Sequence, residues 1–411
     1  MVVGAGLSGL ACARWLVASG MSVVVLEAAD EVGGRVRTDL VDGFRLDRGF
    51  QVLNPAYPAL RDTVNLDRLN LSSFLAGALV SIGTKRHLVA DPRRYPKGLL
   101  STLRAPVGSP AGKVRLATMA LQIARRDQQG DLSLTEATTA EALQRRGIEQ
   151  TTIETLLRPF LSGVFLEDGL ATSSRFFDFV LRSFVNGAPG LPEHGMAALP
   201  AEVARPLPEG TVRLSTPARS VSPGRVVTDD ATLRARAVVV AVDAGQVGSL
   251  LPGFAAPRMR SVTTWYHTTP GTPGSSLVGG RPVLLVDGQR RGPVVNTSVL
   301  SNVVEGYAPP GSTLVSSSVL GVSGSAADED AVRDHLSVLY GTSTASWELV
   351  RRVEVPAALP AMGPPLNLSK PVRYAEKTYV CGDHRDTGSI QGALVSGRRA
   401  AEAATNDLAA R

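Results

Sequence analysis

The 411-residue sequence lacks several features that define common protein classes. It has only two cysteines, Cys12 and Cys381, at opposite ends of the chain, which excludes a disulfide scaffold and fits a reducing compartment. Hydrophobic residues make up 44% of the chain and charged residues 19%, so a disordered chain is also excluded. The longest candidate for a membrane-spanning helix, residues 69–84, is too short to span a membrane, and no basic leader precedes the first apolar run. We therefore predict a cytoplasmic protein with a large buried core.

Lysine is scarce as well, because only five of the 43 basic residues are lysine and the rest are arginine. The formal net charge is +6, and no stripe of aromatic and basic residues points to nucleic acid as a partner. One segment is strongly unbalanced: residues 85–126 carry ten basic side chains and a single acid, Asp91. A solvated surface explains such a segment, and so does peripheral contact with an anionic membrane, so both interpretations stay open.

Motifs for hydrolytic and metal chemistry are missing. The sequence has no G-x-S-x-G elbow, no C-x-x-C pair and no H-E-x-x-H helix, so we predict no metal site. The five histidines are scattered, and only His194 and His384 fall near the loops interpreted below as cofactor loops. A lone loop histidine is usually solvated or structural, so neither is assigned a chemical role.

What the sequence does contain, in its first 27 residues, is a complete dinucleotide-binding pattern. A short strand leads into Gly4-Ala-Gly6-Leu-Ser-Gly9, an apolar helix follows, and a second strand ends at Glu27. Gly4 permits the tight turn, Gly6 lets the backbone approach a pyrophosphate, and Gly9 lets helix and strand pack closely. The helix start offers free amides to the phosphates, and Glu27 can accept hydrogen bonds from both ribose hydroxyls.

A second glycine pair, Gly33 and Gly34, follows the acid and lets another backbone loop approach the same pyrophosphate. Arg35 and Arg37 come next and can neutralise phosphate charge. A nicotinamide site does not need this second loop, so the pattern favours FAD. Residues 44–51 then read as a strand that returns beneath the cofactor.

Residues 4–37 resemble the FAD-binding opening of the flavin amine oxidase and phytoene desaturase superfamily, and the C-terminal end agrees. In that superfamily a Gly-Asp pair meets the ribityl and phosphate groups, the start of the last helix points at the flavin ring, and a middle strand meets the adenine. The resemblance implies FAD, bound non-covalently. The residues it assigns to the cofactor, together with the glycine motifs, are Gly4, Gly6, Leu7, Ser8, Gly9, Glu27, Ala28, Gly33, Gly34, Arg35, Gly49, Phe50, Gln51, Ala218, Gly382, Asp383, Ser389, Ile390 and Gln391.

These features together predict an α/β fold, in which a discontinuous Rossmann-type FAD-binding domain carries an inserted α+β substrate or cap domain. We place the FAD-binding domain at residues 1–75, 196–255 and 372–411. The cap domain then takes residues 76–195 and 256–371.

The first insertion is expected to be largely helical. Its apolar pattern predicts a helix over residues 111–126 with Val114 on the apolar face, and Thr138 with Glu141 forms a capping-box pattern. The second insertion reads as two strands and a helix, at residues 294–304, 313–321 and 329–340. Only one dinucleotide fingerprint is present, which argues against a separate NAD(P)H site.

Six of the ten phenylalanines fall in one stretch, between Phe160 and Phe184. They are explained by the core of a helical cap or by an apolar substrate tunnel over the flavin. Both can hold, because a cap helix has two faces.

Two positions depart from the amine oxidase pattern. Flavin amine oxidases place a lysine on a strand of the second insertion, where it holds a water at flavin N5, and the matching stretch here has Thr264. They also place an aromatic wall of an amine-clasping cage two positions before the residue that corresponds to Gln391, and here that position is Ser389. The C-terminal pattern is closer to that of desaturases. Catalytic residues stay unassigned, with Thr264, Ser389 and Gln391 as candidates.

The function implied is that of an FAD-dependent oxidoreductase of the phytoene desaturase-like branch. It would dehydrogenate or isomerise a lipophilic small molecule by hydride transfer to flavin N5, with oxygen or a quinone as electron acceptor. The first alternative is an amine oxidase that makes an imine and hydrogen peroxide, and the second is a non-catalytic flavin-binding subunit. The substrate, the electron acceptor and the oligomeric state stay open.

Overall fold

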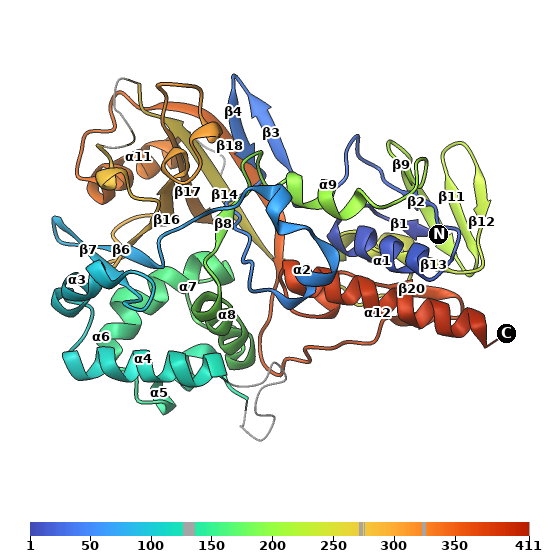
Figure 1. Cartoon of the computed structure of the whole chain (residues 1–411), viewed down its shortest axis with the longest axis horizontal. Helices are drawn as coiled ribbons and strands as arrows, with labels where there is room; N and C mark the ends of the chain where they lie inside the picture. Colours follow the sequence, from blue (N-terminus) through green and yellow to red (C-terminus); the bar gives the residue numbers. More distant parts are fainter. Residues whose placement is uncertain (126–135, 271–273, 275, 323–325, 411) are drawn as a thin grey trace.

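The computed structural model describes residues 1–125, 136–270, 274, 276–322 and 326–410. The chain forms two bodies side by side, of which one holds both termini and the other is built from the two insertions (Figure 1). We call them the FAD-binding body and the cap body. Among the described helices, none combines the length and the apolar character that a membrane span requires.

The FAD-binding body is built on a six-stranded sheet in the order β19-β20-β13-β1-β2-β9. Adjacent strands of this sheet are parallel, except that β19 is antiparallel to β20. The strands are β1 (Val2–Val3), β2 (Val25–Leu26), β9 (Val212–Arg213), β13 (Val238–Val240), β19 (Arg373–Ala375) and β20 (Thr378–Val380). They come from all three segments expected for this domain. The discontinuous Rossmann-type sheet is thus confirmed, while the exact boundaries stay a prediction.

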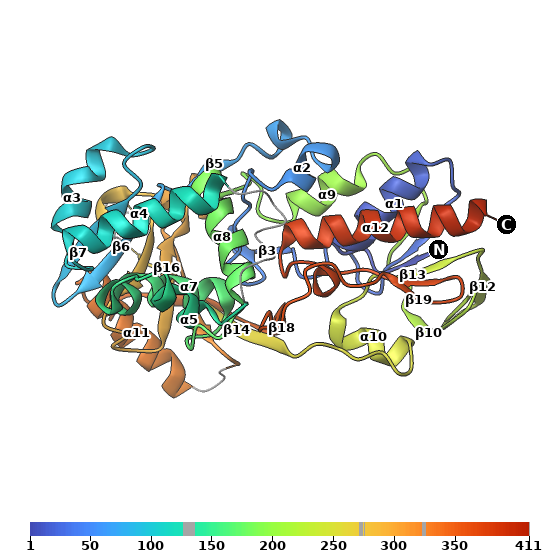
Figure 2. The ribbon, with the colours of Figure 1, turned by 90° about the horizontal axis from the view of Figure 1, so that it is seen from below.

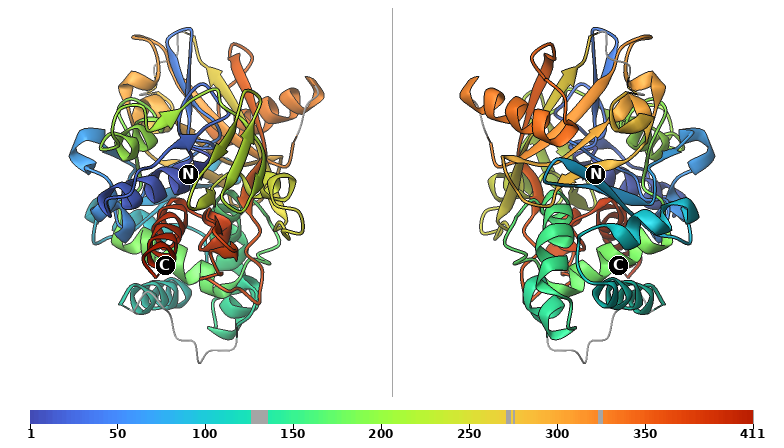
Figure 3. Two further views of the ribbon diagram at one scale, coloured as in Figure 1. Left: turned by 90° about the vertical axis from the view of Figure 1, so that its right-hand side faces the viewer. Right: turned by 90° about the vertical axis from the view of Figure 1, so that its left-hand side faces the viewer.

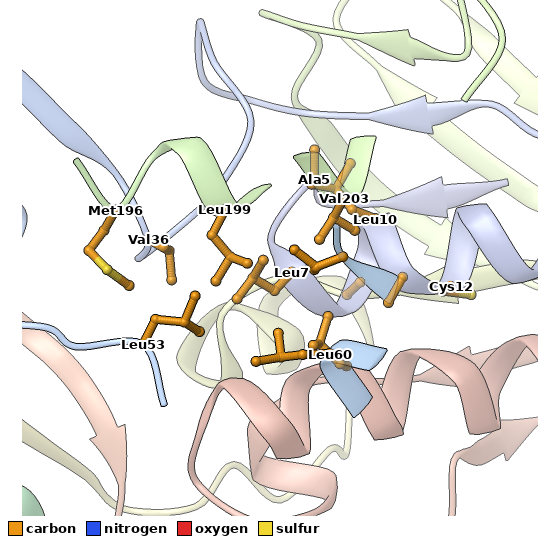
Figure 4. Packing of buried hydrophobic residues seen from close by; sticks show 14 of the residues in the cluster. Ala5, Leu7, Leu10, Cys12, Val36, Leu53, Leu60, Met196, Leu199 and Val203 are labelled. Carbon is orange, nitrogen blue, oxygen red and sulfur yellow. The ribbon is translucent and has the colours of Figure 1, made fainter. Parts of the chain in front are cut away.

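Helices cover one face of this sheet, and a helix with a small antiparallel sheet covers the other (Figures 2 and 3). On the first face lie α1 (Leu7–Ala18), α9 (Ala198–Ala204) and α12 (Ile390–Ala409), and on the second α10 (Ala244–Leu250), β10 (Ala218–Ser222), β11 (Arg225–Thr228) and β12 (Thr232–Arg234). Because side chains alternate along a strand, Val2 packs beneath α1 and Val3 into the opposite core. Figure 4 shows Leu7 of α1 close to Leu199 of α9, and Leu10 of α1 beside Val203 of α9.

Short elements complete the FAD-binding body. They are the hairpin of β3 (Thr38–Val41) and β4 (Phe44–Asp47), helix α2 (Pro58–Thr63), and the pair β5 (Ser72–Ser73) and β8 (Gly190–Leu191). Single 3₁₀ turns in the two bodies span Leu66–Leu69, Pro96–Gly98, Val278–Gly280, Leu300–Asn302, Glu305–Tyr307 and Asp383–Arg385.

The cap body is built on a seven-stranded sheet in the order β18-β14-β17-β16-β15-β6-β7. Its strands are β6 (Gly77–Ile82), β7 (Lys85–Ala90), β14 (Met259–Thr268), β15 (Leu284–Asp287), β16 (Val294–Val299), β17 (Leu314–Leu320) and β18 (Glu348–Pro360). The two insertions meet in this sheet where β6 pairs in parallel with β15. The first insertion is therefore not entirely helical, because its first two strands extend the sheet of the second.

Helices of the cap body are α3 (Leu99–Arg104), α4 (Pro110–Arg125), α5 (Thr139–Arg145), α6 (Gln150–Thr152), α7 (Arg158–Phe165), α8 (Ser174–Asn186) and α11 (Ala326–Tyr340), with a π-helical turn at Ile153–Leu157. The capping box at Thr138 and Glu141 is confirmed, since each side chain accepts from the other residue's backbone amide. The expectation for Val114 is wrong. Its side chain is 64% exposed, because α4 turns Met119 and Ile123 inward against the cap core. Residue 126, at the end of the expected helix, lies outside the described residues.

The expected strand over residues 294–304 is also too long. β16 ends at Val299, and the backbone amides of Val303 and Val304 both donate to the carbonyl of Leu300 in a turn. The other expectations for this insertion hold, with β17 close to residues 313–321 and α11 covering residues 329–340.

A buried carboxyl group joins the two bodies. Asp47 of β4 accepts hydrogen bonds from the Thr38 hydroxyl (2.5 Å) and the Met196 amide (2.9 Å), both in the FAD-binding body. From the cap body, the Tyr307 hydroxyl donates to its carboxylate (3.0 Å) and the Tyr266 hydroxyl to its backbone carbonyl (2.7 Å). Burial raises the pKa of Asp47 to about 6, although the hydrogen bonds act in the opposite direction.

Candidate functional site

Residues of both bodies line a cavity of about 890 Å³, which we call the first cavity. Its FAD-body side carries the glycine turn after β1, the end of β2 and the start of α12, and its cap side carries apolar residues of α7 and α8. Every residue assigned above to the cofactor lines this cavity except Gly9 and Gln391. The strand order explains this gathering, because the carboxyl ends of parallel strands meet at one edge of a sheet.

The three glycines of the first motif differ in what surrounds them. Gly4 has φ +103°, a conformation that favours glycine. A Cβ on Gly6 would have only the carbonyl oxygen of Gly33 near it, at 4.0 Å, so this backbone face is open to the cavity. A Cβ on Gly9 would stand 2.0 Å from the carbonyl oxygen of Gly4, so Gly9 serves the packing of α1 on β1.

The start of α1 is suited to a pyrophosphate. Its N-cap is Gly6, which has no side chain to bond the first-turn amides, and Leu7 and Ser8 line the cavity. Gly33 and Gly34 stand opposite with positive φ, and a Cβ on Gly34 would lie 3.4 Å from the Cα of Gly6. Two backbone segments without side chains thus face the same space, at the positive end of a helix dipole.

Glu27 closes the ribose end of this cradle. Its carboxylate accepts hydrogen bonds from the amides of Ala5 (2.6 Å) and Ala29 (2.9 Å), which fix its orientation. A carboxylate has about four acceptor positions, so two hydroxyl groups can still be bound. Ala28 and Ala218 line the cavity beside it. The residues present therefore fit FAD.

The two arginines after the second glycine pair make different contacts from those expected. Arg35 donates to the carboxylate of Asp383 (2.7 Å) and to the carbonyl of Ala358 (2.8 Å), and it lies 3.5 Å from Asp243. It lines the cavity, but its charge is already balanced, and its main effect is to tie the glycine loop to α12's approach segment and to β18. The contacts of Arg35 therefore do not favour the expected role of this side chain in neutralising phosphate charge.

Arg37 points to the acids of its own loop. It pairs with Asp30 (3.0 Å) and Glu31 (3.1 Å) and does not line the first cavity. The helix start and the backbone amides of the two glycine loops are then the groups left to balance a pyrophosphate.

The start of α12 separates its two candidate residues. Ser389 lines the first cavity and its hydroxyl caps the helix by accepting from the Gly392 amide (3.1 Å). The side-chain oxygen of Gln391 accepts from the amide of Ala59 (2.9 Å), on the α2 side of the helix, and Gln391 lines a second cavity instead. Position therefore gives no support to Gln391 as a flavin contact.

Thr264 is buried beneath the cavity and does not line it. Its hydroxyl oxygen accepts from the amide of Phe50 (3.3 Å). The strand register aligns Thr264 with Ser318 of β17, and Ser318 with Asn296 of β16. Ser318 and Asn296 do line the cavity, as does Val262 of β14. No lysine is among the described residues that line it.

Sequence reasoning missed several lining residues, namely Val242, Asp243, Gln246, Asn296 and Ser318. The first three follow β13, and the end of that strand was a usable signal because its neighbours also end at the site. Asn296 and Ser318 gave no signal, since only the pairing of distant strands brings them to the flavin side.

Neither histidine singled out by the sequence lines the first cavity. His194 is exposed on the loop before α9. His384 is buried against Phe254, and burial lowers its pKa to about 4, so the ring is neutral near pH 7. Cys381 is buried as well, and the neighbouring Cys381 thiol together with burial raises the pKa of Cys12 well above its usual value.

The phenylalanines divide between the two interpretations. Phe160, Phe176 and Phe184 line the first cavity, whereas Phe165 and Phe177 are buried in the cap core. The cap helices therefore serve both as a core and as the apolar wall of the cavity.

Comparison with known proteins agrees with this geometry. A family model described as flavin containing amine oxidoreductase matches residues 7–405. Putrescine oxidase of Kocuria rosea is 30% identical over 283 residues, which cover 59% of this chain and 56% of that protein. Protoporphyrinogen oxidase 2 of Arabidopsis thaliana is 28% identical over 169 residues, which cover 41% of this chain and 32% of that protein. The matched part thus spans about half or less of these relatives.

Solved structures with the same fold match over nearly the whole chain. Cyclohexylamine oxidase of Brevibacterium oxydans has a TM-score of 0.72 at 17% identity, covering 99% of this chain and 98% of its own. A double mutant of putrescine oxidase has a TM-score of 0.70 at 19% identity, covering 98% of each chain. The chain therefore belongs to the family of flavin-containing amine oxidoreductases, with FAD as its cofactor.

Proposed function

We propose that the protein dehydrogenates a lipophilic small molecule at the flavin ring. The observation that carries this proposal is the substrate end of the first cavity, which is walled by Phe160, Phe176 and Phe184 and contains no lysine among its described lining residues. A lysine beside the flavin and an aromatic at position 389 would favour an amine as substrate. FAD would supply the two-electron oxidant, and oxygen or a quinone would reoxidise it.

The chain's own residues bind, orient and exclude water. Gly6, the first amides of α1 and Glu27 would hold FAD non-covalently at its phosphate and ribose groups. Arg35 fixes the glycine loop to Asp383, and so positions the two segments that flank the flavin. The apolar wall keeps water from the reacting carbon, which favours a close and aligned approach to the ring.

The amine oxidase alternative is supported by the names of relatives, which include oxidases of putrescine and of cyclohexylamine. Other relatives are oxidases of protoporphyrinogen, so the family alone does not choose a substrate class. A non-catalytic flavin-binding subunit is the remaining alternative, and it predicts a flavin that no substrate reduces.

Anaerobic reduction of the flavin separates the three possibilities. We expect bleaching of the flavin absorbance by a member of a panel of polyenes and porphyrinogens, and little by benzylamine or putrescine. Rapid reduction by either amine with peroxide release would favour the amine oxidase, and no reduction by any compound would favour the subunit. Acid precipitation of the same preparation should release the yellow colour, because Cys381 is buried and does not line the first cavity.

We also propose a peripheral contact with anionic membranes, now narrowed to α3 and its flanks. Leu100 and Leu103 of α3 are 62% and 49% exposed, and Leu99 shares their face. Lys97 and Arg104 flank them, exposed and without an ion pair among the described residues. An apolar face between cations is the arrangement that binds a lipid surface.

A further inference from the structure

A second cavity, of about 1,880 Å³, lies beside the first and is lined by α2, α5, α8, α12 and the segment after β18. We call it the arginine cleft, because its described lining residues include seven arginines and only three acids. The arginines are Arg61, Arg94, Arg145, Arg146, Arg175, Arg182 and Arg399, and the acids are Glu136, Asp178 and Asp386.

Each acid of the arginine cleft already has an arginine partner. Arg146 binds Asp178 through two hydrogen bonds, of 2.6 and 2.8 Å. Arg175 lies 3.6 Å from Glu136, and Arg399 lies 3.3 Å from Asp386. These pairs balance the charges of three of the seven arginines, and Arg182 is not free either, so three arginines remain.

Arg61 and Arg145 are exposed to the cleft, and within the described chain they have no hydrogen bond or ion pair. Within the described part of the chain, Arg94 donates to the carbonyls of Phe184 (3.2 Å) and Gly187 (2.8 Å) and to no other group. Such donors hold a guanidinium in place but do not balance its charge. Among the described residues, the cleft therefore carries uncompensated positive charge from Arg61 of α2 and Arg145 of α5, whereas the charge of Arg94 also acts on Asp91 of the first cavity. A guanidinium presents a planar fork of donors that suits carboxylates.

The arginine cleft meets the first cavity. Arg94 and Ser183 line both, so the two cavities are direct neighbours that share these residues as a wall. Beside it, Phe179 lines the cleft and Tyr57 lines the first cavity, and their rings stack at 6.0 Å with an interplanar angle of 5°. These two rings therefore stand at the boundary between the cleft and the first cavity.

We propose that the arginine cleft binds the carboxylates of an organic anion whose apolar part reaches the first cavity between Arg94 and the Tyr57–Phe179 pair. This assignment rests on the proposed function, because it names the substrate class: a lipophilic molecule that carries at least two carboxylates. The same positive charge disfavours diamines, since a cation must enter against uncompensated arginines.

The test uses the FAD-loaded protein and three probes with the same carbon chain: dodecanedioate, dodecane-1,12-diol and 1,12-diaminododecane. Calorimetric titration at low ionic strength measures their dissociation constants. We expect the dianion to bind tightest and the diamine weakest, with the dianion's affinity falling as salt is raised. In Arg61→Ser/Arg145→Ser the dianion should bind at least tenfold more weakly.

The matched control is Arg225→Ser/Arg234→Ser, which removes two exposed arginines from the hairpin of β11 and β12, away from both cavities. It should bind the dianion as the unmodified protein does. Equal weakening in both double variants, or a diamine that binds as tightly as the dianion, overturns the proposal.

Binding and flavin reduction separate this proposal from the proposed function. If the dianion binds in the cleft but no compound of the reduction panel bleaches the flavin, the proposed function fails and the cleft assignment stands. Suppose that neutral lipophilic compounds reduce the flavin equally fast in the unmodified protein and in Arg61→Ser/Arg145→Ser, and that both proteins bind the dianion equally well. The cleft assignment then fails, while the proposed function stands.

Discussion

Gly6 is the residue at which the cofactor assignment is tested most directly. Its added Cβ would project into the first cavity without touching the protein, at 4.0 Å from the carbonyl oxygen of Gly33. We expect Gly6→Val to fold normally and to lose at least 90% of its bound FAD, because the branched side chain occupies the path of the pyrophosphate. Absorbance at 450 nm per protein gives the occupancy.

Gly9→Val is the contrasting variant, since its Cβ would meet the carbonyl oxygen of Gly4 at 2.0 Å. Here the expected loss is of the fold itself, with a lower melting temperature of the FAD-free protein. If Gly6→Val keeps its full FAD content, the first cavity is not the cofactor site.

At the level of residues the sequence predicted backbone roles better than side-chain roles. The glycines and Glu27 were predictable, because the motif fixes where they lie relative to one strand and one helix. Arg35 and Arg37 were assigned to phosphate, yet they pair with Asp383 and with Asp30 and Glu31. The partner of a long side chain is chosen by the tertiary structure, which spacing along the chain does not contain.

At the level of elements, Asp47 connects β4 to both bodies and gives a pH dependence whose sign can be worked out. Its pKa is about 6 when folded and close to 3.8 when unfolded. The folded state therefore binds more proton between these values, and the stability that the neutral form provides is lost as pH rises from about 4 to about 6. The shift corresponds to about 3 kcal/mol.

Asp47→Asn removes this titration, so only the unmodified protein loses this stability as pH rises. The unfolding free energy of the variant minus that of the unmodified protein should therefore increase by about 2–3 kcal/mol from pH 4 to pH 7. Urea unfolding followed by tryptophan fluorescence measures it. Asp42→Asn, on the exposed turn of the same hairpin, is the control and should show a constant difference. A constant difference for Asp47→Asn would mean that this carboxyl stays ionised when folded.

The elements themselves were predictable where their pattern is local. The capping box of α5 and the extent of α11 followed from a few neighbouring residues. β6 and β7 form a local hairpin around Gly83-Thr84 that sequence reasoning missed, whereas their place in the cap sheet depends on the pairing of β6 with β15, some 200 residues away in the chain. The polar row of Thr264, Ser318 and Asn296 depends on the same kind of non-local register.

At the scale of the whole molecule, the position of α3 decides how the protein could meet a membrane. The helix lies in the cap body, on the side turned away from both termini (Figures 1 and 2). Arg94, shortly before it, lines both cavities. A lipid surface held at α3 would therefore lie close to the junction through which a lipophilic substrate is proposed to pass.

Residues 85–126 attract an anionic surface less strongly than their composition suggested, because several of their cationic side chains already bind carbonyl or carboxylate groups of the protein. Lys113 donates to the carbonyls of Leu103 and Ala105, and Arg93 pairs with Asp91. The apolar face of α3 must then supply much of the binding, and transfer of two half-exposed leucines into lipid is worth about 2 kcal/mol. Lys97 and Arg104 each add about 1 kcal/mol near an anionic surface.

We therefore expect co-sedimentation with anionic vesicles at low salt, loss of binding with neutral vesicles, and a decrease as salt is raised. Leu100→Ser/Leu103→Ser should weaken the binding at least tenfold, since it removes the apolar contact and leaves every charge in place. Leu40→Ser/Leu214→Ser is the control, because these leucines are equally exposed, at 71% and 41%, but lie on the FAD-binding body. If both pairs of substitutions weaken binding alike, the attraction is a general one, and α3 is only a solvated surface that happens to carry three leucines.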